Sequence, residues 1–199
     1  MPAPFSAREN PFASERIEQL LKFDPSWLGT EWETILDEFE EEHERRAAVI
    51  GAHGSGKTTF LDTFEPLFRE KTGLRVCRLF LNDEKPELTR QERVFLTNIP
   101  NHESTVIFLD GEERMNFFDR LEFSRLAHGF AGLLVTRHTP RRGIPTLLET
   151  KTTPEMLAAF LKKLMPDFPA VESEVADLFV AHDGNLREAL REAYDRVGI

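Results

Sequence analysis

The chain has 199 residues, of which 40% are hydrophobic, so it is long enough to bury a core without disulfide bonds. Its one cysteine, Cys77, excludes an internal disulfide and a zinc cluster built on cysteines. The 35 acidic and 25 basic residues give a net charge of −10, which argues against a protein that coats nucleic acid by charge alone. Residues 1–46 hold 12 of the acids and 5 of the bases, so most of the acid excess lies near the N-terminus.

No stretch of the sequence approaches the roughly 20 apolar residues of a membrane-spanning helix. The first residues also lack the basic start and apolar run of a secretory signal. We therefore expect a cytoplasmic protein without membrane contact. Local contact with nucleic acid is neither indicated nor excluded.

Short apolar runs alternate with helical patterns along the chain. Helices are expected at 31–46, 57–69, 89–98 and 114–128, and strands at 47–50, 74–81, 104–109, 131–136 and, more briefly, 146–149. From Thr153 onward the pattern is helical, without a strand signal. Strands that alternate with helices predict crossover units and a parallel sheet. The predicted α/β fold has a linker and acidic helix (1–46), a core (47–150) and a helical lid (151–199).

The residues after the first strand match the phosphate-binding pattern G-x-x-x-x-G-K-[ST] in full, between a buried strand and a helix. Glycines let successive backbone N–H groups face phosphate oxygens, and the helix N-terminus adds positive charge. A turn that binds nothing is the alternative interpretation. The residues expected to contact the nucleotide here are Gly51, Ala52, His53, Gly54, Ser55, Gly56, Lys57, Thr58 and Thr59. Lys57 can reach the β- and γ-phosphates, and the Thr58 hydroxyl can bind Mg²⁺.

An acid stands at the end of the third strand. Asp110 follows four apolar residues at the strand edge that faces the ligand crevice in a parallel sheet. There it can hold Mg²⁺ together with the Thr58 hydroxyl, although an acidic turn residue before Gly111 is the alternative. Glu112 and Glu113 come next, and either can orient the attacking water or simply form the acidic first turn of a helix.

With both motifs in place, the chain resembles the P-loop NTPases, specifically the additional-strand division (ASCE) that contains the AAA+ and STAND ATPases. This resemblance implies a three-layer fold with a five-stranded parallel sheet in the order 5-1-4-3-2. The cofactors that it implies are ATP and Mg²⁺. The Asn10-Pro11-Phe12 segment is similar to the linker that packs near the adenine in several such ATPases.

Three local matches extend the resemblance. Leu109-Asp110-Gly111-Glu112-Glu113 looks like the STAND pattern with a second acid three residues after the first, which implies a catalytic role for Glu113. The end of the fourth strand, Thr136-Arg137, is similar to the sensor-1 region, with Thr136 at the nucleotide and Arg137 at the γ-phosphate. Asp183-Gly184-Asn185-Leu186-Arg187 resembles the start of a lid helix in which the arginine, here Arg187, senses the γ-phosphate.

The arginines also have plainer interpretations. Arg137 can belong to a solvated basic loop, and Arg187 can pair with nearby acids of its own helix. Arg141 and Arg142 can act on the nucleotide of a neighbouring copy or remain solvated.

The function expected from these features is that of a Mg-dependent ATP-binding protein, an ATPase or an ATP-driven switch of the AAA+/STAND type. One alternative is a small-molecule P-loop kinase, which normally lacks the extra strand and the helical tail. Another is a regulatory module that binds nucleotide without hydrolysing it. A protein partner or self-association is expected, without an identity.

Overall fold

The computed structural model of the chain describes residues 22–164 and 172–197. The strands are β1 (Arg46–Ile50), β2 (Arg75–Phe80), β3 (Thr105–Asp110), β4 (Gly132–Arg137) and β5 (Thr146–Glu149). The α-helices are α2 (Trp32–Asp37), α3 (Lys57–Thr72), α4 (Arg90–Asn98), α5 (Phe117–Ala127), α6 (Pro154–Leu164), α7 (Glu172–Ala181) and α8 (Leu186–Val197). Short helical turns occur at η1 (Pro25–Leu28), η2 (Glu38–Glu42), η3 (His102–Ser104) and η4 (Glu112–Arg114).

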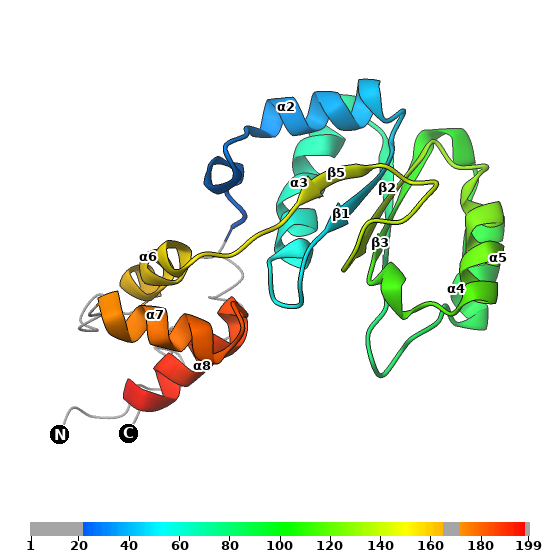
Figure 1. Cartoon of the computed structure of the whole chain (residues 1–199). Coiled ribbons are helices and arrows are strands. Elements are labelled where there is room, and N and C mark those ends of the chain that lie inside the picture. The colour runs from blue at the N-terminus through cyan, green and yellow to red at the C-terminus, as the bar shows by residue number, and fades with distance from the viewer. Residues whose placement is uncertain (1–21, 165–171, 198–199) are drawn as a thin grey trace, which may run out of the picture.

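The five strands form one parallel sheet in the order β2-β3-β4-β1-β5 (Figure 1). Read from its other edge, this is the predicted order 5-1-4-3-2, which is therefore confirmed. Strand β4 lies between β1 and β3, so the P-loop strand and the strand that ends in Asp110 have one strand between them. The predicted α/β class and the existence of every expected strand are confirmed as well.

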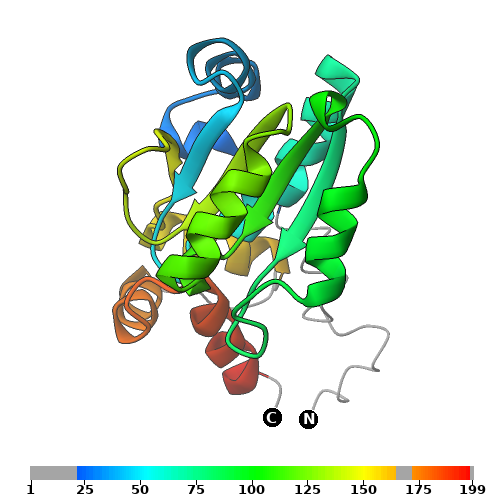
Figure 2. The ribbon, with the colours of Figure 1, turned by 90° about the vertical axis from the view of Figure 1, so that its right-hand side faces the viewer.

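Helices cover both faces of the sheet, which gives the molecule three layers (Figures 1 and 2). Successive strand residues point to opposite faces. Ala47 and Val49 of β1 join a core cluster with α2 and α3, whereas Ala48 and Ile50 join a cluster with α4 and α5. Figure 2 shows α4 and α5 lying side by side over the second face.

Phenylalanine fills the core on the α3 face. Phe60, Phe64 and Phe68 repeat every fourth residue along α3, so they share one face of that helix and stack on each other. Phe39 and Phe108 pack against the same rings from η2 and β3. The abundance of Phe in the composition is therefore partly explained by this cluster, all five members of which are fully buried.

Two predicted helices are clearly shorter in the structure, whereas α3 runs three residues beyond its predicted end, to Thr72. The predicted helix 31–46 ends early: α2 gives way to one π-helical turn, and Glu44 and Arg45 have positive φ angles of 47° and 59°. The chain must turn there because Arg46 already begins β1. The predicted helix 114–128 begins only at Phe117, because the Asn116 side chain accepts hydrogen bonds from the next turn and caps the helix.

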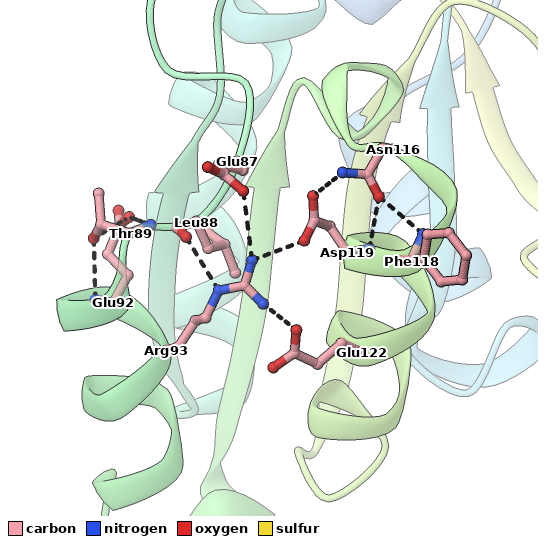
Figure 3. A network of polar contacts seen from close by, with 9 residues as sticks. All are labelled: Glu87, Leu88, Thr89, Glu92, Arg93, Asn116, Phe118, Asp119 and Glu122. Atoms are coloured by element: carbon pink, nitrogen blue, oxygen red, sulfur yellow. Dashed lines mark hydrogen bonds and ion pairs between the residues drawn. The ribbon is translucent and has the colours of Figure 1, made fainter.

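A polar network joins α4 to α5 (Figure 3). Arg93 of α4 donates to Asp119 of α5 over 3.0 Å, forms an ion pair with Glu122 and donates to the Leu88 carbonyl over 3.1 Å. The hydrogen bond with Asp119 raises the pKa of Arg93. Since exposed ion pairs contribute little individually, the network mainly fixes how the two helices lie relative to each other.

The C-terminal helices form a unit with its own core. Met156, Leu157 and Leu161 of α6 pack against Leu178 of α7 and Leu190 of α8. This cluster lies apart from the two that flank the sheet. In the part of the chain that the structure describes, no helix is long and apolar enough to cross a membrane.

We expect Phe64→Ala to lower the free energy of unfolding by about 3–5 kcal/mol, because it leaves a cavity among fully buried rings. Phe118→Ala is the matched control, since 78% of the Phe118 surface is exposed, and it should change stability by less than about 0.5 kcal/mol. Denaturant unfolding measures both. Equal losses in the two variants would contradict the assigned core.

Candidate functional site

The P-loop lies between β1 and α3, where the sequence pattern places it (Figure 1). Gly51, the first residue after β1, has a φ of +155°, and a Cβ there would lie 2.2 Å from the Thr150 hydroxyl oxygen. Only glycine fits this approach. The Ser55 and Thr150 hydroxyls are 2.6 Å apart, and Thr150 donates to the Ile50 carbonyl over 3.1 Å. The loop is therefore fastened to the end of β5, through a threonine that no motif in the sequence indicates.

Lys57 folds back over the loop that precedes it. Its Nζ donates to the carbonyl oxygens of Gly51 at 2.7 Å and Ala52 at 2.8 Å. Burial lowers the pKa of Lys57, whereas the nearby carboxylates of Glu113 and Asp110 raise it. Thr58 and Thr59 follow in the first turn of α3, half-buried.

Asp110 lies at the carboxyl end of β3 and is 4% exposed. Its Oδ1 accepts a hydrogen bond from the Thr136 hydroxyl over 2.5 Å, and Thr136 Oγ1 accepts in turn from the Gly111 N–H at 2.8 Å. Thr136 thus fixes the orientation of Asp110. The predicted contact of Thr136 with the nucleotide remains a prediction, since the contacts of its hydroxyl described here are with Asp110 and Gly111.

The second oxygen of Asp110 fits a magnesium ligand. Within the described residues, Oδ2 is buried and has no hydrogen-bond partner, and the nearest cation is Arg78 Nη2 at 3.7 Å. A buried carboxylate oxygen without a partner is costly unless a cation or donor is supplied. Oxygen is the ligand that Mg²⁺ prefers, so Asp110 and the Thr58 hydroxyl form a donor set that suits this ion.

Glu112 and Glu113, adjacent in sequence, have different surroundings. Glu112 is 3% exposed, and its carboxylate forms ion pairs with three arginines. The distances are 2.7 Å to Arg120 Nε, 3.2 Å to Arg141 Nη1 and 3.9 Å to Arg137 Nη1. Glu113 instead lies near Lys57, with its Oε1 3.2 Å from His138 Nε2. Of the two candidates that the sequence left open, Glu113 is the one on the P-loop side.

The structure does not bring the Arg137 side chain to the P-loop. Leu133 and Val135 of β4 pack on the α5 face, and Arg137 continues that alternation. Its guanidinium is buried there, donating to the Ile144 carbonyl over 2.7 Å and pairing with Glu112. Burial lowers the pKa of Arg137, and the Glu112 carboxylate raises it. In this structure Arg137 thus forms an ion pair on the α5 face of the sheet, and its expected contact with the γ-phosphate remains a prediction.

The other basic candidates also differ from one another. Arg141, at the tip of the β4–β5 loop, reaches Glu112, so it is part of the same ion-pair cluster. Arg142 and Arg187 are exposed. The predicted roles of Arg142 on a neighbouring copy and of Arg187 at the γ-phosphate remain predictions.

The C-terminal helical unit touches the P-loop through Asn185. A Cβ on Gly54 would lie 2.1 Å from the Asn185 amide oxygen, so the two residues are in close contact. The same oxygen accepts from the backbone N–H groups of Arg187 at 3.1 Å and Glu188 at 3.3 Å and caps α8. Asn185 belongs to the Gly-Asn motif, but the sequence alone directed attention to Arg187.

Aromatic residues lie where the N-terminal segment meets α3. The Phe23 ring stands 3.7 Å from the position of a Cβ on Gly56 and packs against Trp32 and Phe60. Phe23 and Trp32 line a cleft of about 480 Å³ that Lys163 of α6 also borders. Asn10-Pro11-Phe12, the predicted adenine-side linker, lies outside the described residues.

No protein-family model matches the chain, and no curated protein matches its sequence. Solved structures do resemble it. Cdc6p from Pyrobaculum aerophilum has a TM-score of 0.54 at 16% identity, over 98% of this chain and 64% of that chain. AMPPCP-bound DnaA from Aquifex aeolicus has a TM-score of 0.57 at 16% identity, over 92% of this chain and 66% of that chain. Drosophila ORC bound to DNA has a TM-score of 0.52 at 17% identity, over 84% of this chain and 56% of that chain.

The chain thus spans about two thirds or less of the length of these proteins. All three are AAA+ P-loop ATPases. At 16–17% identity the likeness concerns the fold, and it agrees with the strand order and the P-loop position described above. The chain has the AAA+ P-loop NTPase fold.

Proposed function

We propose that the chain binds ATP with Mg²⁺ and hydrolyses it, as an ATPase or an ATP-driven switch. The observation that carries this proposal is the placement of three charged groups at one sheet edge. Lys57 folds over the P-loop carbonyls, and the buried Asp110 carboxylate ends β3. Glu113 contacts His138, whose ring centroid lies 6.4 Å from that of His53 in the P-loop.

Asp110 Oδ2 has no hydrogen-bond partner among the described residues and forms only a 3.7 Å ion pair with Arg78, so it is suited to a metal ion. Glu113 stands on the side of His138 and the P-loop. A turn that only connects a strand to a helix requires neither acid.

Each group then has a distinct task. The Lys57 ammonium exchanges its two carbonyl contacts for phosphate oxygens. The Thr58 hydroxyl and Asp110 Oδ2 hold Mg²⁺, which supplies charge neutralisation at the phosphates when it is bound. Glu113 orients the attacking water and accepts its proton. Glu112 is unsuited to this task because arginines occupy its carboxylate.

A weakly hydrolysing regulatory switch is the second candidate. The specific observation in its favour is the position of Arg137, which faces Glu112 and not the P-loop, so this structure lacks the predicted arginine at the γ-phosphate. A small-molecule kinase is less well supported, because β4 between β1 and β3 and the helical tail α6–α8 are features that such kinases normally lack. AMPPCP in the DnaA structure supports a nucleotide as the ligand. A protein partner or self-association remains a proposal without identity.

We expect Lys57→Ala to weaken ATP binding at least tenfold, about 1.4 kcal/mol or more, because the cradle loses its cation. Calorimetric titration of the purified chain with MgATP measures this change. Lys71→Ala is the matched control, since Lys71 lies at the far end of α3 and pairs with Asp37. An unchanged dissociation constant in Lys57→Ala would contradict the site.

We expect Glu113→Gln and Glu112→Gln to separate chemistry from stability. Glu113→Gln should lower phosphate release by about 10²-fold or more and retain ATP binding. Glu112→Gln should lower the free energy of unfolding by about 3–5 kcal/mol, because it leaves the buried Arg137 guanidinium without its acid. Phosphate-release assays and denaturant titrations on both variants test the assignment. The reverse pattern would transfer the catalytic role to Glu112.

A further inference from the structure

We propose that His138 is a positioning residue that holds the Glu113 carboxylate at the phosphate side of the P-loop. This inference rests on the proposed ATPase function and deepens it. Its basis is a contact between two loops: Glu113 lies in η4, just after β3, and His138 is the first residue after β4. Since β3 and β4 are neighbours in the sheet, their carboxyl ends bring these two side chains together.

The contact divides the two oxygens of Glu113. Oε1 lies 3.2 Å from His138 Nε2. Within the described residues, Oε2 is buried and has no hydrogen-bond partner. One oxygen thus contacts the imidazole, while the other remains available as an acceptor. A general base needs this arrangement, because a mobile carboxylate loses the alignment that the proton transfer requires.

His138 is suited to hold a carboxylate without neutralising it. The charged and titratable groups that face it are Glu113, Lys57, Arg114 and His53, whose ring centroid is 6.4 Å from that of His138. Burial lowers the pKa of His138 from its usual value of about 6.5; Lys57, Arg114 and His53 lower it further, and Glu113 raises it in part. The lowered pKa favours the neutral imidazole at pH 7, and its Nε2 lies in contact with Oε1 at 3.2 Å.

A neutral donor has a chemical consequence. A cationic donor would stabilise the ionised carboxylate strongly and so weaken it as a proton acceptor. Glu112 illustrates the cationic case, with ion pairs to three arginines. Glu113 contacts one imidazole ring and keeps an oxygen without a hydrogen-bond partner in the described residues, which suits Glu112 to anchoring and Glu113 to proton transfer.

The test uses the full chain and four variants: His138→Ala, His138→Gln, Glu113→Gln and the double variant of His138→Ala with Glu113→Gln. We expect His138→Ala to lower kcat for ATP about tenfold and to leave KM within about twofold. His138→Gln keeps an N–H donor and should recover to within about threefold of the wild type. In the Glu113→Gln background, His138→Ala should add less than about twofold, because the group that it positions is already disabled.

A second readout does not depend on hydrolysis. NMR titration of the His138 imidazole in the nucleotide-free chain should show a lower pKa in Glu113→Gln than in the wild type, because the carboxylate that raises it is gone. His128→Ala, at the exposed end of α5, is the control and should leave both kcat and this titration unchanged.

Three results would overturn the inference: a kcat in His138→Ala equal to that of the wild type, effects of His138→Ala and Glu113→Gln that simply multiply, or a His138 titration that ignores Glu113→Gln. A wild-type chain that binds ATP and releases no phosphate would refute the proposed hydrolysis instead. If the His138 pKa still depended on Glu113 in such a chain, the contact between His138 and Glu113 would be structural only. The positioning role would then be refuted together with the hydrolysis.

Discussion

The alternation of side chains across a parallel sheet, with a helical layer on each face, is the constraint from which the chemistry of this protein follows. Every second residue of a strand must face α3, and the others must face α4 and α5. Asp110 continues the row of Val106 and Phe108 on the α3 face, where the P-loop helix begins. Thr136 continues the row of Leu134 on the same face, so it meets Asp110. Arg137, the next residue of β4, must therefore point to the opposite face, where it pairs with Glu112.

The Glu112 cluster is the counterpart of the phosphate site on the opposite face. One buried carboxylate gathers Arg120 from α5, Arg137 from β4 and Arg141 from the β4–β5 loop. Arg120 also donates to the carbonyl of Met115, which follows η4 directly. A buried acid in such a position connects α5, β4 and the β4–β5 loop to the turn that follows β3. The turn that carries Glu113 therefore has one side anchored in an ion-pair cluster and the other side open to the P-loop.

Much of the fold was predictable because its signals are local. The apolar runs mark all five strands, and the glycine-rich pattern before Lys57 marks the loop between β1 and α3. The strand order followed from the family resemblance, not from periodicity. Side-chain partners were less accessible: nothing in the sequence says that Thr136 donates to Asp110, because that contact depends on the register of β3 against β4. The early end of α2 was missed for a related reason, since the chain must turn at Glu44 to bring Arg46 into the sheet.

The contact between Gly54 and Asn185 has a consequence for how loss-of-function variants are interpreted. Gly54 has a φ of +74° and lies directly under the lid asparagine that caps α8. Any side chain at this position would strain the loop backbone and at the same time displace the first turn of α8. A phenotype from substituting this glycine would therefore combine the effects of a distorted P-loop and a displaced α8. Substitutions at residues whose side chains touch either the P-loop or α8, but not both, would separate the two effects.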